Sequence, residues 1–149
     1  MKSVDSTFEE RVRASFAQQA LMKTIGASMT KVSPGEVVIE LAFREDLTQQ
    51  HGFVHAGVIT AIVDSACGYA ALSLMPPDSG VLTVEYKANF VSPAKGERFI
   101  ATGRVVKPGR TLTVCSGDVL AVDEGKEKIV ATMLATMMRL PEKASSSDG

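Results

Sequence analysis

The sequence is poor in aromatic residues, histidine and cysteine, and it carries almost no excess of charge. It has no tryptophan, two tyrosines and six phenylalanines, so its core must be mainly aliphatic. A formal net charge of −1 argues against a strong general affinity for nucleic acid or for an anionic membrane. The two histidines and two cysteines do not stand at metal-ligand spacing, so we expect no metal site.

Cysteine usage and the first residues of the sequence bear on the compartment. Cys67 and Cys115 both lie in apolar surroundings, which favours two buried thiols in a reducing compartment over a disulfide. The opening MKSVDSTFEERVR carries acidic residues and no apolar run, unlike a secretory signal. These features predict a cytoplasmic protein.

A length of 149 residues predicts one domain, flanked by two short segments. Residues 1–24 form an N-terminal helical segment, in which an amphipathic helix over 7–24 ends at Gly26. Its apolar residues are near helical spacing: Phe8, Val12, Phe16, Leu21 and Ile25. The main domain spans 25–140, and the polar stretch 141–149 is expected to be a disordered tail.

The longest apolar stretch, residues 56–75, predicts a helix because it is rich in alanine and too long for a strand. Its apolar residues face every direction, which is typical of a helix in the middle of a core. A membrane span of this length would bury Asp64 near the bilayer centre at a cost of about 3 kcal/mol. The nearest basic residues, Arg44 and Lys87, are too distant to mark a membrane interface, so we expect no membrane association.

The remaining segments predict strands. Two short strands flank a turn at 33–36, and 81–91 alternates between apolar and polar residues. Three further strands near 97–106, 110–122 and 127–140 form an antiparallel meander. The expected fold is α+β, a long central helix wrapped by a curved antiparallel sheet of about six strands. Because one sheet covers only one side of such a helix, we expect a homo-oligomer, a dimer or a dimer of dimers.

Asp64 is the most unusual residue of the apolar helix. No lysine or arginine lies within four positions of it, and an unpaired buried carboxylate is costly. Burial would raise its pKa, which favours a functional role. Cys67 has no nearby histidine to activate it and is interpreted as a core residue.

Three further features each allow two interpretations. His55 precedes the helix, where an ordinary cap is the simpler interpretation and a catalytic role the alternative. Small residues at Ala56 and Gly57 either pack closely or leave the helix N-terminal N–H groups open to a developing negative charge. The basic residues around the KPGR turn form either a solvated hairpin tip or an anion site: Arg104, Lys107 and Arg110.

The segments QQHGFVHAGVITAIVDSACGYAA, VEYKANFVSPAKGE and GRTLTV resemble the hotdog-fold thioesterases of the phenylacetate-degradation (PaaI-like) branch. The resemblance covers about residues 25–140. That branch has Asn, two residues, Gly, two residues, His-Gly-Gly, then Asp nine positions after the histidine. Gly52, His55, Gly57 and Asp64 are in register, whereas Gln49 replaces the asparagine and Ala56 the first glycine after the histidine.

The resemblance implies an acyl-CoA thioesterase without a cofactor. In that family the carboxylate at Asp64 drives hydrolysis, the N–H at Ala56 polarises the carbonyl, and a hydroxyl at Thr83 lies near the attacking water. Gln49 can still donate an amide N–H, and the KPGR region is the candidate for the CoA phosphates. Two alternatives remain: a hotdog dehydratase or hydratase using His55 and a carboxylate, and a non-catalytic acyl-CoA sensor.

The chemistry of a thioester leads to the same requirements. A thiolate, with a conjugate-acid pKa near about 8.5, leaves without a strong acid, so the site needs only an oxyanion hole and a base or nucleophile. Asp64 lies eight residues after Ala56, about 12 Å along a helix. An aspartate cannot cover that distance, so we expect the two groups to act from different chains of a dimer.

Overall fold

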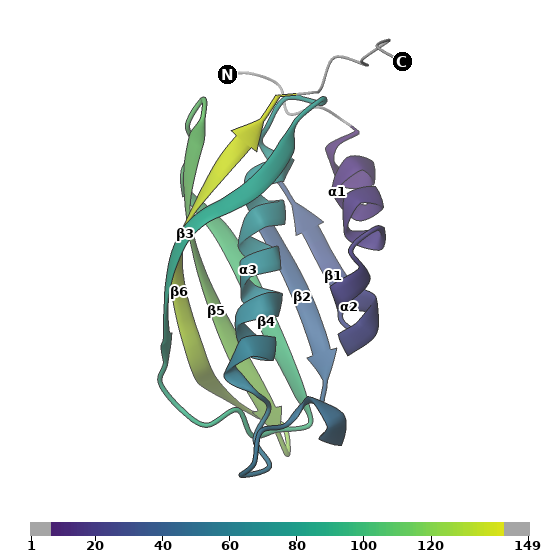
Figure 1. Cartoon of the computed structure of the whole chain (residues 1–149), viewed down its shortest axis with the longest axis vertical. Coiled ribbons are helices and arrows are strands. Elements are labelled where there is room, and N and C mark those ends of the chain that lie inside the picture. The colour runs from purple at the N-terminus through teal and green to yellow at the C-terminus, as the bar shows by residue number, and fades with distance from the viewer. Residues whose placement is uncertain (1–6, 142–149) are drawn as a thin grey trace.

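A six-stranded antiparallel sheet curves around one long helix in the computed structural model, which describes residues 7–141 (Figure 1). The helical elements are α1 (Phe8–Ala17), α2 (Ala20–Ile25), the 3-10 helix η1 (Glu45–Leu47) and α3 (Ala56–Ser73). The strands are β1 (Ser28–Ser33), β2 (Glu36–Ala42), β3 (Gly80–Phe90), β4 (Arg98–Lys107), β5 (Leu112–Asp123) and β6 (Lys126–Leu140). The predicted architecture is confirmed.

The sheet has the order β1-β2-β4-β5-β6-β3. The last three strands along the chain, β4, β5 and β6, form the predicted meander. β3 pairs with β6 rather than with its neighbour in sequence, β4, so it lies at one edge of the sheet. The start of this edge strand and α3 together line the pocket that is described below.

The α3 helix packs directly on the sheet because two strand positions lack side chains. A Cβ atom at Gly103 of β4 would collide with the backbone at Ala66 and Cys67, and one at Gly117 of β5 would lie 2.6 Å from Val63 Cγ2. Glycine therefore allows the close approach of helix and sheet. Although α3 has the length and hydropathy of a membrane span, 61% of it is buried inside the fold, as in the core helix of a folded domain.

The prediction of one helix over residues 7–24 is wrong, because the segment divides into α1 and α2 at Gln18 and Gln19. Gln19 has extended backbone angles (φ −78°, ψ 101°), which rotate the following turn. As a result Leu21, assigned to the apolar face, is 52% exposed, while Met22 is buried. α1 packs against the C-terminal half of α3 (Figure 1), and the Gln19 side chain at the junction of the two short helices reaches the same half.

The two thiols lie in the core, as predicted. Cys67 and Cys115 are free and fully buried. Burial raises the pKa of the Cys67 thiol, and it raises the pKa of Cys115 to about 11. Both thiols are thus protonated and inert at neutral pH. Except for Pro141, the predicted tail at 141–149 lies outside the described residues.

Candidate active site

Five of the residues singled out from the sequence line two separate pockets. The first, here called the Asp64 pocket, has a volume of about 570 Å³ and is lined by α1, α3 and the start of β3, including Asp64 and Thr83. The second, the Gln49 pocket, has a volume of about 480 Å³ and is lined by Gln49, His55 and Ala56. Neither of these pockets contains all the predicted site residues.

Asp64 is a half-buried carboxylate with a hydroxyl partner. Thr83 Oγ1 donates a hydrogen bond to Asp64 Oδ1 at 2.7 Å. Partial burial raises the pKa of the Asp64 carboxyl, and the Thr83 hydrogen bond opposes that rise. The sequence analysis expected no cation beside Asp64, and the partner that the structure shows is a neutral hydroxyl. Within residues 7–141, however, no ion pair includes Asp64.

A β-bulge brings Thr83 to the face of the sheet that carries α3. Thr83 lies opposite the buried Met137, but the register shifts by one residue between Thr83 and Glu85. Tyr86 then lies opposite the buried Ala135, on the same face as Thr83. The strict alternation predicted for 81–91 is wrong at this point, because it placed Thr83 on the opposite face from Tyr86.

His55 caps the N-terminus of α3, which was the simpler of the two interpretations. Its Nδ1 accepts a hydrogen bond from the Gly57 N–H at 2.7 Å, so that backbone group is already satisfied. A Cβ atom at Gly57 would lie 2.9 Å from the same nitrogen, so a side chain at this position would clash with the capping imidazole. The Ala56 N–H has no acceptor among the described residues and remains open at the Gln49 pocket.

Gln49 is held with its amide nitrogen free. Its Oε1 accepts hydrogen bonds from the backbone N–H groups of His51 at 2.5 Å and Phe53 at 3.3 Å. These two donors fix which end of the amide is the oxygen. The Nε2 group has no acceptor within residues 7–141, so the side chain offers N–H donors at the pocket.

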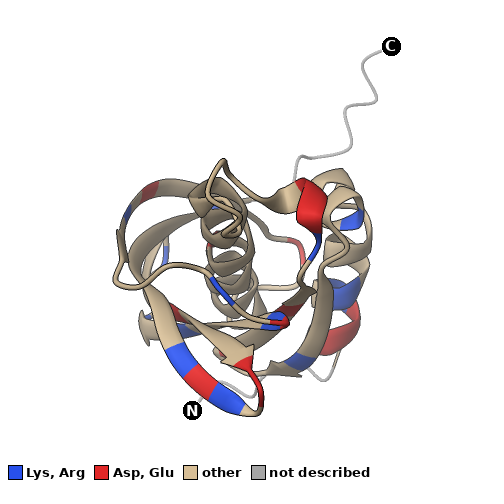
Figure 2. Cartoon of the chain, turned by 90° about the horizontal axis from the view of Figure 1, so that it is seen from below, with Lys and Arg blue, Asp and Glu red and all other residues tan. Residues whose placement is uncertain are grey.

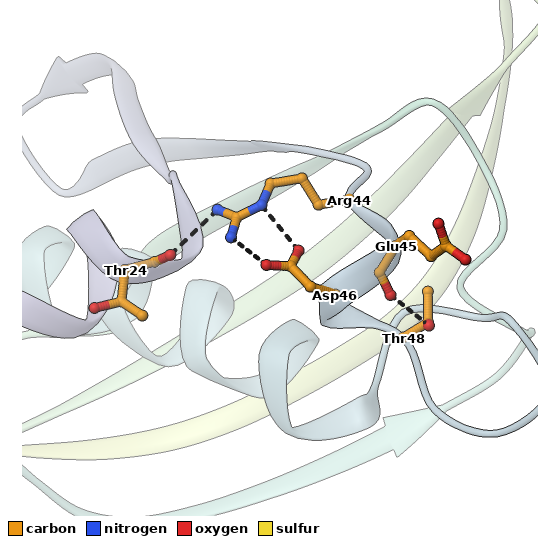
Figure 3. A network of polar contacts seen from close by, with 5 residues as sticks. All are labelled: Thr24, Arg44, Glu45, Asp46 and Thr48. Carbon is orange, nitrogen blue, oxygen red and sulfur yellow. Dashed lines mark hydrogen bonds and ion pairs between the residues drawn. The ribbon is translucent and has the colours of Figure 1, made fainter.

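A polar network holds the loop that carries Gln49 (Figure 3). Arg44 donates to both carboxylate oxygens of Asp46, at 3.0 and 2.7 Å, and to the carbonyl of Thr24 at the end of α2. Thr48 Oγ1 donates to the Glu45 carbonyl at 2.7 Å. The hydrogen bond from Arg44 lowers the pKa of the Asp46 carboxyl. The network therefore fastens η1, just before Gln49, to α2.

The three basic residues assigned to CoA binding do not form one cluster. Arg104 donates to Asp118 at 3.1 Å in an ion pair. Lys107 ends β4, and Arg110 lies in the KPGR turn, beside Leu74 near the C-terminal end of α3. Figure 2 shows that charged residues lie mainly on the outer elements, while the central helix is almost uncharged.

Sequence reasoning missed a hydrogen-bond cluster in the Asp64 pocket. The Tyr69 hydroxyl accepts from Ser15 Oγ at 3.3 Å and from Gln19 Nε2 at 3.1 Å, and Ser65 Oγ donates to Gln19 Oε1 at 3.1 Å. These partners are 46 to 54 residues apart in the chain. No local pattern relates them, and only the break between α1 and α2 aims Gln19 at α3. No group of three His, Cys, Asp or Glu residues in 7–141 could hold a metal ion.

Comparison with known proteins gives this arrangement its family. Residues 51–128 match the Thioesterase superfamily. A thioesterase family protein from Silicibacter pomeroyi has 51% sequence identity and a TM-score of 0.89, with 90% of this chain and 98% of that chain covered. The chain belongs to the thioesterase superfamily and has its hotdog fold, as the resemblance implied.

Two further relatives show the range of the similarity. Acyl-coenzyme A thioesterase 13 of Homo sapiens is 29% identical over 85% of this chain and 91% of that protein. The E. coli PaaI protein from the phenylacetic acid degradation operon has a TM-score of 0.83 at 19% identity, covering 95% of this chain and 99% of that one. At that identity the PaaI likeness concerns the fold.

Proposed function

We propose that this thioester hydrolase is an acyl-CoA thioesterase of the PaaI-like branch, with Asp64 as its base or nucleophile. Water adds to the thioester carbonyl, Asp64 accepts a proton from it, and the C–S bond breaks to release a carboxylic acid and CoA. The observation that carries the proposal is the Asp64 carboxylate, half-buried and hydrogen-bonded to Thr83 in a pocket. The similarity to acyl-coenzyme A thioesterase 13 supports CoA as the thiol.

The proposed site is shared between two chains of a homodimer. Ala56 and Asp64 lie about 12 Å apart along α3, whereas a base must approach the attacking water within about 3 Å. Two antiparallel copies of α3 would bring the donors of one Gln49 pocket to the carboxylate of the other chain's Asp64 pocket. The Gln49 amide and the Ala56 N–H would then stabilise the oxyanion while Asp64 and Thr83 hold the water.

Two uncovered surfaces beside Asp64 support this dimer. On α3, the exposed or half-buried residues Gly57, Thr60, Ala61 and Asp64 share one face at helical spacing. On β3, apolar side chains are each about half exposed: Leu82 (50%), Val84 (50%), Tyr86 (47%) and Phe90 (49%). Tyr86 and Phe90 share the face of Thr83, whereas Leu82 lies on the other face, so apolar side chains flank both sides of an edge strand with which a second copy could pair.

The KPGR turn remains the proposed contact for the CoA phosphates, with Lys107 and Arg110 as its available cations. The turn lies near the C-terminal end of α3, about 27 Å from the helix start in the same chain. An antiparallel partner would bring it towards the other chain's Gln49 pocket. Arg104 contributes less, because it is already paired with Asp118. A cytoplasmic location agrees with two free, buried cysteines.

A panel of acyl-CoAs assayed with a thiol reagent tests the proposal directly. Release of CoA from at least one ester is expected, and the two buried cysteines of the native protein should give little background. A dehydratase or hydratase would change the acyl group without releasing thiol, and a sensor would bind without turnover. No thiol release from any ester, with a known thioesterase active in the same assay, would contradict the proposed function.

A further inference from the structure

The Asp64 pocket extends beyond the groups needed for hydrolysis. From Asp64 it continues along α3 past Ser65, Gly68, Tyr69 and Leu72, with α1 as the opposite wall. These residues follow Asp64 at one, four, five and eight positions and share a face of the helix. The carboxylate thus lies at one end of a pocket that continues towards the C-terminal half of α3.

Gly68 opens the floor of this pocket. It lies one helical turn after Asp64, inside a helix, where glycine is less stable than alanine by about 1 kcal/mol. The structure gives no packing reason for the missing side chain, because a Cβ atom there would meet nothing closer than Met137 Sδ, at 3.9 Å. The space that a methyl group would take is pocket space.

The wall of the pocket at Tyr69 is polar. Gln19 Nε2 donates to the Tyr69 oxygen, and the Tyr69 and Ser15 hydroxyls share one hydrogen bond at 3.3 Å, which leaves one hydroxyl hydrogen of this pair to donate. No acceptor for that hydrogen is present among residues 7–141, although the Tyr69 residue is only 5% exposed. A buried hydroxyl normally finds a partner, and this one lines the pocket.

We infer that the Asp64 pocket holds the acyl group of the substrate, that Gly68 makes room for its chain, and that Tyr69 donates a hydrogen bond to an oxygen at its far end. The inference rests on the proposed thioesterase function. Asp64 and Tyr69 are five residues apart, about 7.5 Å along the helix. At about 1.25 Å per carbon, from C–C bonds of about 1.5 Å, this span fits an acyl chain of about six carbons. The substrate class is therefore a short acyl-CoA with a terminal hydroxyl or carbonyl group.

The polar end is tested with hexanoyl-CoA and 6-hydroxyhexanoyl-CoA, which differ by one hydroxyl. We expect kcat/KM to favour the hydroxylated ester at least about tenfold, because a site built to bond a polar group rejects the analogue without it. Tyr69→Phe should bring that ratio close to one. Tyr86→Phe, which changes the chain's other tyrosine, is the matched control and should leave the ratio as in the wild type. Equal rates on the two esters with wild-type protein, or a ratio that survives Tyr69→Phe, would overturn the assignment of Tyr69.

The chain pocket is tested with Gly68→Ala, for which activity and stability should change in opposite directions. Loss of a helical glycine should raise Tm by about 2 °C. The added methyl should lower the hexanoyl-to-acetyl ratio of kcat/KM by about tenfold, since one methylene of misfit in an apolar pocket has an effect of that order. An unchanged ratio in a stabilised variant would show that the acyl chain lies elsewhere. If no acyl-CoA is hydrolysed by wild-type protein, the proposed function itself has failed, which is a different result from hydrolysis without chain or hydroxyl selectivity.

Discussion

The Asp64 pocket and the Gln49 pocket offer a thioester opposite kinds of chemistry. The first has a carboxylate of raised pKa beside a hydroxyl. The second has the free amide of Gln49 and the open N–H of Ala56, and no carboxylate lines it within residues 7–141. Hydrolysis needs a proton acceptor and oxyanion donors at one carbonyl. The comparison teaches that the two kinds of group lie in different pockets of one chain, as the proposed site shared by two chains requires.

The largest effect should come from removing the charge of the Asp64 pocket. Asp64→Asn should lower kcat by about 10²–10⁴-fold, the contribution of a general base. Asp123→Asn, at the last residue of β5, is a matched control and should have little effect. Steady-state kinetics of both variants on a hydrolysed acyl-CoA measures the difference, and near wild-type kcat for Asp64→Asn would remove Asp64 from the mechanism.

Asp64→Asn should also make the folded protein more stable at neutral pH. Because burial raises the folded-state pKa of Asp64 above its ordinary 3.8, the stability linked to its protonated form is present below pH 3.8 and lost as pH rises through the raised value. Asp64→Asn should therefore unfold at a higher temperature than the wild type at pH 7, and the gap should narrow towards pH 4.

Removing a donor from the Gln49 pocket should have the next largest effect. Gln49→Ala should lower kcat by about 10²-fold with a smaller change in KM, because an oxyanion donor acts mainly in the transition state. Gln50→Ala, at the next residue along the wall of the same pocket, shows how much of the effect belongs to the Gln49 amide itself. A raised KM with unchanged kcat would instead make Gln49 a residue that only binds substrate.

Removing the Thr83 hydroxyl should change how kcat depends on pH. Its hydrogen bond lowers the pKa of Asp64 against the effect of burial, so Thr83→Val should move that pKa still higher. In the wild type, kcat should rise with pH through a midpoint above 3.8, because Asp64 must be ionised to act. In Thr83→Val the midpoint should shift to higher pH. A midpoint that does not move would separate Thr83 from the ionisation of Asp64.

The smallest effect concerns the His55 cap. His55→Ala should lower the free energy of unfolding by about 1 kcal/mol, whereas His55→Asn keeps a capping oxygen and should lose less. Activity should follow the same order, since the cap positions the Ala56 N–H. If His55→Asn is stable yet as inactive as an Asp64 variant, His55 takes part in the chemistry itself.

Much of the fold could be predicted because its signals are local. The length of the apolar run gave α3, and period-two segments with turn residues gave the strands. The strand order could not be predicted, because the pairing of β3 with β6 is a choice between distant partners. The break between α1 and α2 at Gln18–Gln19 could not be predicted, because the helical spacing of apolar residues continues across it.

The site divides in the same way. A sequence motif could identify part of the site, because its residues are close in sequence: Gly52, His55, Gly57 and Asp64. Thr83 was named only through the family resemblance, because a single bulged residue, Val84, reverses the alternation on which a sequence prediction relies. Gln19 and Tyr69 are 50 residues apart, and their hydrogen bond exists only after the end of α1 and the junction that follows it have packed on α3.

Subunit exchange tests most directly whether the two pockets work together across a dimer. Asp64→Asn chains have an intact Gln49 pocket, and Gly57→Trp chains, whose indole would displace His55 and cover the Ala56 N–H, have an intact Asp64 pocket. Each parent should be folded by circular dichroism and nearly inactive. After equal mixing, half of the dimers are mixed and each has one whole site of two, so about a quarter of wild-type activity should return. If verified heterodimers stay inactive while wild-type chains survive the same exchange, the catalytic groups belong to one chain and the shared site is wrong.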